Sequence, residues 1–163
     1  MNKLFTLILF GGFFFFFSNN TYAQKELSSL NILIKAGNYS KYYNPSNKNY
    51  NDSNNAQLHA FFEIPVAENI TVSPAIDLPF NFDYVVIGAR VDYYFDGFIK
   101  NLPKQLDLWG GIDSGIVIGG DGDTFIVNAH GGGEWKFNDT WGGIAEFGAG
   151  TSSYGSIGIG YHF

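Results

Sequence analysis

Apolar and polar side chains alternate with a period of two along most of this chain. The clearest run covers residues 84–95. Its apolar members share one parity: Val85, Ile87, Ala89, Val91, Tyr93 and Phe95. Arg90 and Asp92 belong to the other parity. Because successive side chains of a strand point to opposite faces, this run predicts a strand with one apolar face and one face that carries charge.

The same alternation recurs often enough to predict an all-β protein. Sustained apolar spacing of three and four residues, which would indicate amphipathic helices, is almost absent. Eight strands are expected, over residues 28–38, 56–65, 69–79, 84–96, 105–118, 124–137, 140–150 and 154–163. Short turn-like segments separate most of them, and two connections, residues 39–55 and 97–104, are longer. We therefore expect an eight-stranded antiparallel up-and-down barrel.

The dimensions of the strands and the placement of polar residues predict which face meets water. Strands of about ten residues, at about 3.3 Å per residue and a tilt of about 40°, span roughly 25 Å, the height of the apolar band of an outer-membrane barrel. Apolar-out and polar-in alternation on an even number of strands is typical of these barrels. We therefore expect a transmembrane β-barrel. The alternative is a soluble secreted barrel that binds an apolar ligand, in which every face would be inverted.

Aromatic residues support the transmembrane interpretation by their positions. They gather near predicted strand ends, where a barrel would meet the membrane–water interface: Tyr93, Phe95, Trp135, Phe137, Trp141, Tyr161 and Phe163. Amphipathic rings favour this depth in a membrane. In a soluble barrel the same side chains would instead anchor the core.

The first 23 residues are typical of a secretory signal peptide. Lys3 precedes an apolar segment, residues 4–17, and a short polar stretch ends at the small residue Ala23,. Residues 24–163 would then form a single barrel domain. The chain has no Cys, which excludes disulfides, a lipid anchor on an N-terminal Cys and a thiolate zinc site. Its formal net charge of −6 argues against nucleic acid as a partner,.

The C-terminal residues carry a resemblance to a known family. Residues 154–163 alternate up to the terminal Phe163 and resemble the last strand by which outer-membrane barrel proteins are recognised by their assembly machinery. Residues 135–148 resemble the closing hairpin of small barrels of the OmpA/OmpX-like superfamily. The resemblance implies an outer-membrane protein of a Gram-negative cell, with Tyr161 and Phe163 as its assembly signal. It implies outer-membrane lipid and the barrel-assembly machinery as partners, and we expect a monomer.

Ten charged residues are expected to face the barrel interior. They are Lys35, Glu63, Asp77, Arg90, Asp92, Asp107, Asp113, Glu134, Lys136 and Glu146. Three are positive and seven are negative, and Arg90 is the only Arg of the chain. Because eight strands leave room only for side chains, and buried charges must pair, a structural plug is the favoured interpretation. The alternative is porin-like, a narrow cation-favouring path gated by these ion pairs.

The three His residues, His59, His130 and His162, also have the inward parity. Small lipid-modifying barrels that deacylate lipid A carry a His and a Ser two residues apart. Here His59 is followed by Ala and Phe, and His130 by two Gly residues. A general base also needs a placed nucleophile and an orienting group, which the pattern does not provide. We therefore assign no catalytic residue, cofactor or metal, and expect a structural or porin-like protein rather than an enzyme.

Three further segments are rich in Gly or lie in loops. Residues 119–123 offer two carboxylates to calcium but too few ligands, so a solvated hairpin turn is expected,. Residues 131–133 are all Gly and lack the Lys and helix of a phosphate loop, so we expect bulky neighbours to pack across them,. The Tyr- and Asn-rich residues 39–55 suggest contact with a surface ligand, but a non-binding loop is favoured,.

Overall fold

The computed structural model describes residues 28–38, 54–95, 98–99, 101–119 and 124–163. The predicted signal peptide, residues 1–23, lies outside the described residues, as do residues 39–53 of the longest connection and residues 120–123 of the acidic turn. Those three predictions therefore stay predictions.

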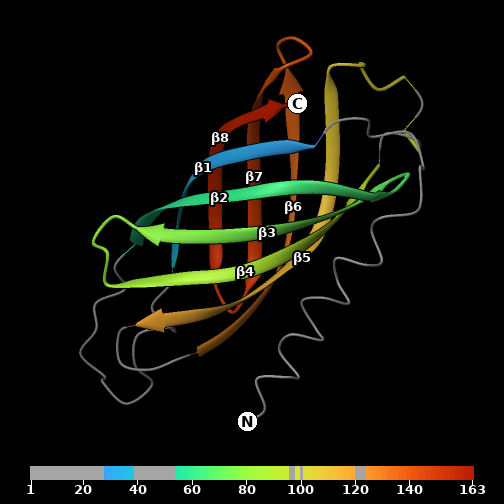
Figure 1. Ribbon diagram of the computed structural model, residues 1–163. Coiled ribbons are helices and arrows are strands. Elements are labelled where there is room, and N and C mark those ends of the chain that lie inside the picture. The colour runs from blue at the N-terminus through green and yellow to red at the C-terminus, as the bar shows by residue number, and fades with distance from the viewer. Residues whose placement is uncertain (1–27, 39–53, 96–97, 100, 120–123) are drawn as a thin grey trace.

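The described residues form eight antiparallel strands that close into one barrel. The strands are β1 (Ser29–Asn38), β2 (Asn54–Ala67), β3 (Ile70–Pro79), β4 (Tyr84–Tyr94), β5 (Leu106–Gly119), β6 (Thr124–Lys136), β7 (Trp141–Gly150) and β8 (Ser153–His162). Each pairs with its neighbours in the chain, and β1 pairs with β8 to complete the circle. Figure 1 shows β1–β4 as the front wall, with β6–β8 behind them. The predicted fold class is confirmed.

Most strand boundaries differ from the predicted ones by one or two residues. β2 is longer at both ends, because backbone pairing continues where the side-chain pattern stops. β2 begins at Asn54 rather than at residue 56, since its register with β1 extends through Asn38. β4 ends at Tyr94 rather than at residue 96. In the part of the chain that the structure describes, no helix is long and apolar enough to cross a membrane.

Pro74 lies inside β3, where a residue without an N–H group is unexpected,. On the β4 side, Pro74 stands opposite Ala89. On the β2 side, paired residues run as far as Ala75 and resume at Val72, so Pro74 falls in a gap of the ladder. The strand therefore accommodates the proline where no pairing to β2 is interrupted by its missing donor.

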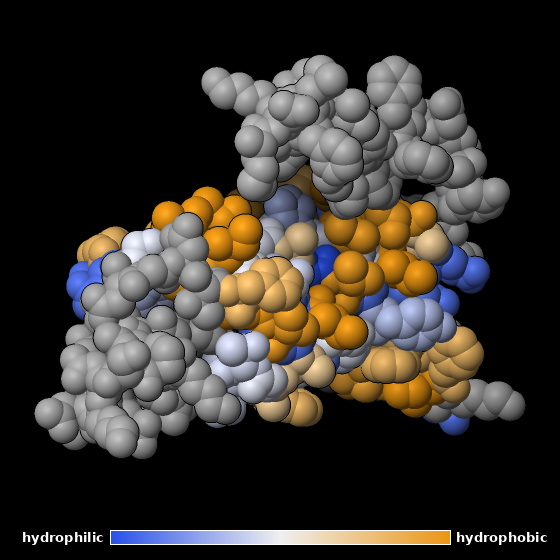
Figure 2. All heavy atoms as spheres, turned by 90° about the horizontal axis from the view of Figure 1, so that it is seen from below, coloured by the Kyte–Doolittle hydropathy of each residue, from blue (hydrophilic) through white to orange (hydrophobic). Residues whose placement is uncertain are grey.

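The two faces of each strand differ sharply in exposure. On β1, Leu30, Ile32 and Ile34 are exposed, whereas Asn31 and Lys35 are buried at 2% relative exposure each. Figure 2 shows apolar side chains spread over the face of the barrel that is seen in that view. Apolar residues therefore face outward and polar residues face inward, as the alternation predicts.

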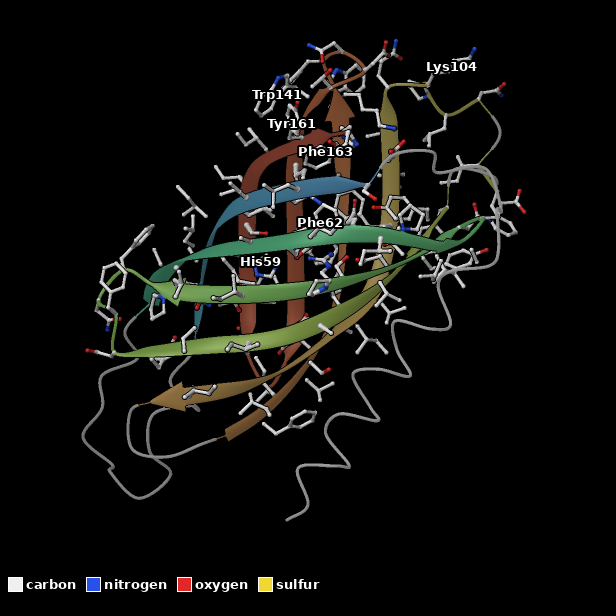
Figure 3. All side chains as sticks on the ribbon, viewed as in Figure 1. His59, Phe62, Lys104, Trp141, Tyr161 and Phe163 are labelled. Carbon is white, nitrogen blue, oxygen red and sulfur yellow. The ribbon has the colours of Figure 1, made fainter. Side chains whose placement is uncertain are left out.

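Aromatic side chains gather on the outer surface where β7 begins and β8 ends. The ring of Tyr161 lies 4.8 Å from that of Trp141 and 5.0 Å from that of Phe163, measured between centroids. Phe163 also contacts Phe62 of β2, at 6.0 Å. Figure 3 shows Trp141, Tyr161, Phe163 and Phe62 along one side of the barrel. This placement matches the predicted clustering of aromatic residues at strand ends.

Candidate functional site

The inward side chains of the barrel carry most of the chemistry of the described residues. Nine of the ten residues predicted to face the interior are buried: Lys35, Glu63, Asp77, Arg90, Asp92, Asp107, Asp113, Glu134 and Glu146. The tenth, Lys136, has a side chain that is 31% exposed. Strand parity places these groups in the lumen, and the closure of the barrel brings together residues that are distant in the chain.

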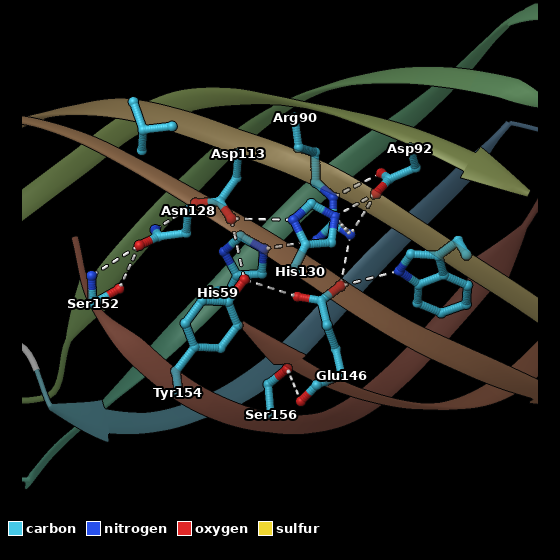
Figure 4. Close-up of polar contacts among 12 residues, drawn as sticks. His59, Arg90, Asp92, Asp113, Asn128, His130, Glu146, Ser152, Tyr154 and Ser156 are labelled. Atoms are coloured by element: carbon cyan, nitrogen blue, oxygen red, sulfur yellow. Dashed lines mark hydrogen bonds and ion pairs between the residues drawn. The ribbon is translucent and has the colours of Figure 1, made fainter. Parts of the chain in front are cut away.

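Arg90 of β4 is the centre of the largest polar cluster. Its Nε and Nη2 donate to the two carboxylate oxygens of Asp92 at 2.8 and 3.0 Å, a bidentate arrangement,. Nη2 also donates to Oε2 of Glu146 on β7 at 2.6 Å. The guanidinium carbon lies 4.0 Å from the ring centroid of Phe61, so one face of the cation packs on an aromatic ring,. We call Arg90, Asp92 and Glu146 the arginine centre (Figure 4).

His130 of β6 connects the arginine centre to a second carboxylate. Its Nε2 contacts Oδ1 of Asp92, and its Nδ1 lies 3.2 Å from Oδ1 of Asp113. Asn128 donates from Nδ2 to Asp113 at 2.9 Å. The hydroxyl of Tyr154 donates to Asp113 at 3.2 Å and to Glu146 at 3.3 Å. Both carboxylates are thus satisfied by several donors, which is what burial requires.

Lys35 and His59 form a further pair of contacts around Asp77. Nζ of Lys35 lies 3.3 Å from Oδ2 of Asp77, and Nδ1 of His59 bonds to Oδ1. The same Lys35 ammonium lies 4.1 Å from the ring centroid of Tyr154. Nε2 of His59 is 3.4 Å from Nη1 of Arg90, which links this group to the arginine centre.

The other predicted interior charges have partners of their own. Glu63 accepts hydrogen bonds from Ser29 and Tyr94. Glu134 pairs with His162 at 2.8 Å, and Asp107 pairs with Lys136 at 2.7 Å. The ten residues are therefore distributed among several groups along the lumen. Each charge in these groups has an oppositely charged or hydrogen-bonding partner.

Inward Gly residues make room for these large side chains. A Cβ atom at Gly111 would come within 2.5 Å of Oδ1 of Asp92 and 2.8 Å of Nε2 of His130. At Gly148 it would lie 2.3 Å from the ring of Tyr154. Because real Cβ atoms do not approach so closely, the polar cluster depends on glycine at both positions.

The Gly triplet at residues 131–133 has the role that the sequence predicts. A Cβ atom at Gly132 would meet Trp109 at 3.0 Å, inside the barrel. At Gly131 and Gly133, which face outward, the nearest side chains are Phe147 at 3.6 Å and Leu108 at 2.9 Å. Bulky neighbours therefore pack across the triplet on both faces of β6.

Buried apolar residues are the part of the interior that the sequence interpretation missed. They form two clusters, which we call the Tyr84 layer and the Trp109 layer. The Tyr84 layer contains Tyr84, Val86, Val117, Ile126 and Tyr154. The Trp109 layer contains Leu33, Phe61, Tyr94, Trp109 and Ile144. Their inward parity is readable in the sequence, but an apolar residue on a polar face gave no sign of which partners it would meet.

The three His residues are all engaged with carboxylates. His59 bonds to Asp77, His130 contacts Asp92 and Asp113, and His162 bonds to Glu134. Among the described residues, no group of three or more His, Asp or Glu side chains is arranged to hold a metal ion.

Comparison with known proteins identifies the class to which this fold belongs. No protein-family model and no curated protein matches the sequence. Among solved structures, Neisserial surface protein A (NspA) is 10% identical with a TM-score of 0.53, covering 83% of this chain and 94% of that chain. The de novo designed barrel TMB2.3 is 14% identical with a TM-score of 0.55, covering 86% and 98%. Another structure, from the de novo design of transmembrane β-barrels, is 15% identical with a TM-score of 0.53, covering 83% and 95%.

At these identities the likeness concerns the fold. The chain has the fold of eight-stranded transmembrane β-barrels. NspA shares this fold, and the likeness is limited to the fold.

Proposed function

We propose that the protein spans the outer membrane of a Gram-negative cell as a monomeric structural barrel without catalysis. Its lumen is filled by paired charges and apolar side chains, so that solutes do not pass freely. The observation that carries this proposal is the combination of an exposed apolar exterior with a buried, charge-paired interior.

The exterior supports insertion in lipid. Large apolar side chains are exposed on several strands, including Ile87 at 54%, Ile112 at 58% and Ile157 at 69%. Soluble monomers rarely expose contiguous apolar patches larger than a few hundred Å². A soluble barrel with an apolar ligand would instead need an apolar cavity, whereas the lumen here is occupied by Arg90, Asp92 and Glu146.

Closure of the barrel supports a monomer in lipid. Every described strand pairs with a neighbour on both sides, so no edge offers free N–H and C=O groups to another chain,. A closed barrel therefore satisfies its backbone without a partner subunit.

The interior supports a plug. An eight-stranded barrel has a lumen just wide enough for side chains, and the arginine centre crosses it from β4 to β7. A porin-like function is the second candidate, and the excess of seven carboxylates over three cationic groups would favour cations,. In that case Arg90→Ala would raise the single-channel conductance.

The His contacts bear on the lipid-modifying alternative. Each His is already paired with a carboxylate inside the barrel, and His59 and His130 also contact Arg90. A nucleophile beside an exposed His, which acyl transfer would require, is not among these contacts. An unchanged lipid A profile in a deletion strain is the expected result, and a loss of one acyl-chain modification would support an enzyme.

The end of the chain supports recognition by the barrel-assembly machinery. Phe163 is 59% exposed, its N–H bonds to the carbonyl of Ser28 at 3.1 Å, and its ring packs on Tyr161. Both aromatic residues thus lie at the seam between the first and last strands. Phe163→Ala should slow insertion in cells while leaving refolding of the purified protein in detergent unchanged.

The first experiment is to express the full-length chain, isolate outer membranes and compare boiled with unboiled samples on a detergent gel. A faster unboiled band in that fraction, together with silence of the purified protein in planar bilayers, is the expected result. Recovery as a soluble periplasmic protein would refute the membrane assignment. A steady single-channel current from the wild type would refute the plug and support the porin-like function.

A further inference from the structure

The apolar and polar side chains of the lumen are arranged in a fixed order along the strands. On β4 the order is Tyr84 and Val86, then Arg90 and Asp92, then Tyr94. On the antiparallel β5 the same three levels appear in reverse, as Trp109, Asp113 and Val117. On both strands, polar residues lie between a member of the Tyr84 layer and a member of the Trp109 layer.

Direct contacts show that both layers adjoin the polar region. From the Trp109 layer, Phe61 packs on the guanidinium of Arg90 at 4.0 Å, and Nε1 of Trp109 donates to Glu146 at 3.2 Å. From the Tyr84 layer, the hydroxyl of Tyr154 donates to Glu146 at 3.3 Å. The arginine centre is therefore enclosed between two apolar layers. Figure 4 shows Tyr154 and Arg90 on either side of Glu146.

The Trp109 layer draws on most of the circumference of the barrel. Its members come from β1, β2, β4, β5 and β7, and Ala75 of β3 packs against them. The members of the Tyr84 layer come from β4, β5, β6 and β8. Between them the two layers include residues of nearly every strand, which is the arrangement needed to fill a narrow lumen.

We propose that these two apolar layers, rather than the ion pairs, close the lumen to ions. The arginine centre is then an enclosed polar chamber between two hydrophobic barriers. This inference rests on the proposed function of a filled, membrane-spanning barrel. A hydrated ion can exchange its water for charged side chains, but it finds no substitute at an apolar constriction, which closes by excluding water. Removing the charges would leave both barriers in place.

Conductance in planar bilayers tests the proposal with three variants. The first, Arg90→Gln with Glu146→Gln, removes the charges of one ion pair. The second, Val117→Ser with Ile126→Ser, polarises the Tyr84 layer only. The third adds Leu33→Ser and Ile144→Ser and polarises both layers.

Because the two barriers are in series, only the third variant should conduct. Current through the first variant, with both layers intact, would overturn the proposal. So would silence of the third variant in preparations that keep the faster unboiled gel band of a folded barrel. Current through the wild type, or its absence from the outer membrane, would instead count against the proposed function.

Thiol labelling gives a second readout that does not require conduction. The chain has no Cys, so Ser156→Cys places a single thiol beside the backbone carbonyl of Glu146 in the chamber. Asp139→Cys, in the exposed β6–β7 turn, is the matched accessible control. A permanently charged methanethiosulfonate should label position 139 but not position 156 of the folded protein.

Polarising one layer alone should make position 156 reactive, because the reagent needs entry from one end only. Labelling of position 156 with both layers intact would overturn the proposal. The proposal would also be overturned if position 156 stayed unlabelled after the Val117→Ser and Ile126→Ser changes, in a barrel that is labelled at position 139.

Discussion

Arg90→Met should destabilise the folded barrel by about 3–5 kcal/mol, the usual cost of breaking a buried ion pair from one side. Arg90 is 1% exposed, and it donates two hydrogen bonds to Asp92 and one to Glu146. Without the guanidinium, two buried carboxylates lose their main positive partner. Met keeps an unbranched stem, and the loss combines the broken ion pairs with the lost contact of the guanidinium on Phe61.

The matched control removes the charges on both sides. Arg90→Met combined with Asp92→Asn and Glu146→Gln leaves no buried carboxylate without its cation. Replacing a whole buried ionic group by well-packed hydrophobic residues of similar volume is often neutral or stabilising, by about 1–4 kcal/mol, and neutral amides likewise leave no uncompensated buried charge. The triple variant should therefore recover most of the stability that Arg90→Met loses.

Reversible unfolding by urea in lipid vesicles measures both free energies. Tryptophan fluorescence should follow the transition, since Nε1 of Trp109 contacts Glu146 in the folded barrel, and the unboiled gel band provides an independent probe. A loss below about 1 kcal/mol, the range of exposed ion pairs, would refute the view that the arginine centre is a coupled buried group. A triple variant no more stable than Arg90→Met would refute it too.

Two further substitution pairs test the interior and the exterior. Gly148→Ala should lower the free energy of unfolding by about 1–3 kcal/mol through overpacking, because its Cβ would lie 2.3 Å from the ring of Tyr154,. Gly155→Ala is the control: a Cβ there has nothing within 4 Å, so the change should be neutral or stabilising in the same unfolding assay. Ile157→Lys, on the outer face at the middle of β8, should cost about 2–4 kcal/mol in lipid, and Ser153→Lys at the end of that strand about 0–1 kcal/mol,. Equal costs at residues 157 and 153 would contradict a lipid-facing exterior.

The strand boundaries show which features of a strand the alternation of its side chains can predict. Alternation identifies all eight strands, because it depends only on the geometry of each strand by itself,. The predicted start of β2, at residue 56, is two residues too late, since Asn54 and Asn55 show no alternation but pair with β1. Pairing of the backbone is a property of two strands together, so one strand's side chains do not reveal where it stops.

The glycine residues also differ in whether the sequence alone reveals their role. The triplet at residues 131–133 is conspicuous in the sequence, and the structure places bulky neighbours across it. Gly111, which follows Gly110, and Gly148 stand at less conspicuous positions of their strands. Their importance comes from Asp92, His130 and Tyr154, which reach them from other strands.

The sequence by itself determined the fold class, the strand count and the facing of the residues, including the inward parity of the charged groups. The tertiary structure decided which of these groups meet. Arg90 and Glu146 are 56 residues apart and touch only because closure of the barrel brings β4 and β7 across a shared lumen. It also decided that Leu33, Phe61 and Trp109 form one apolar layer. Parity follows from the backbone of one strand, whereas contacts across a lumen depend on the stagger and closure of all eight.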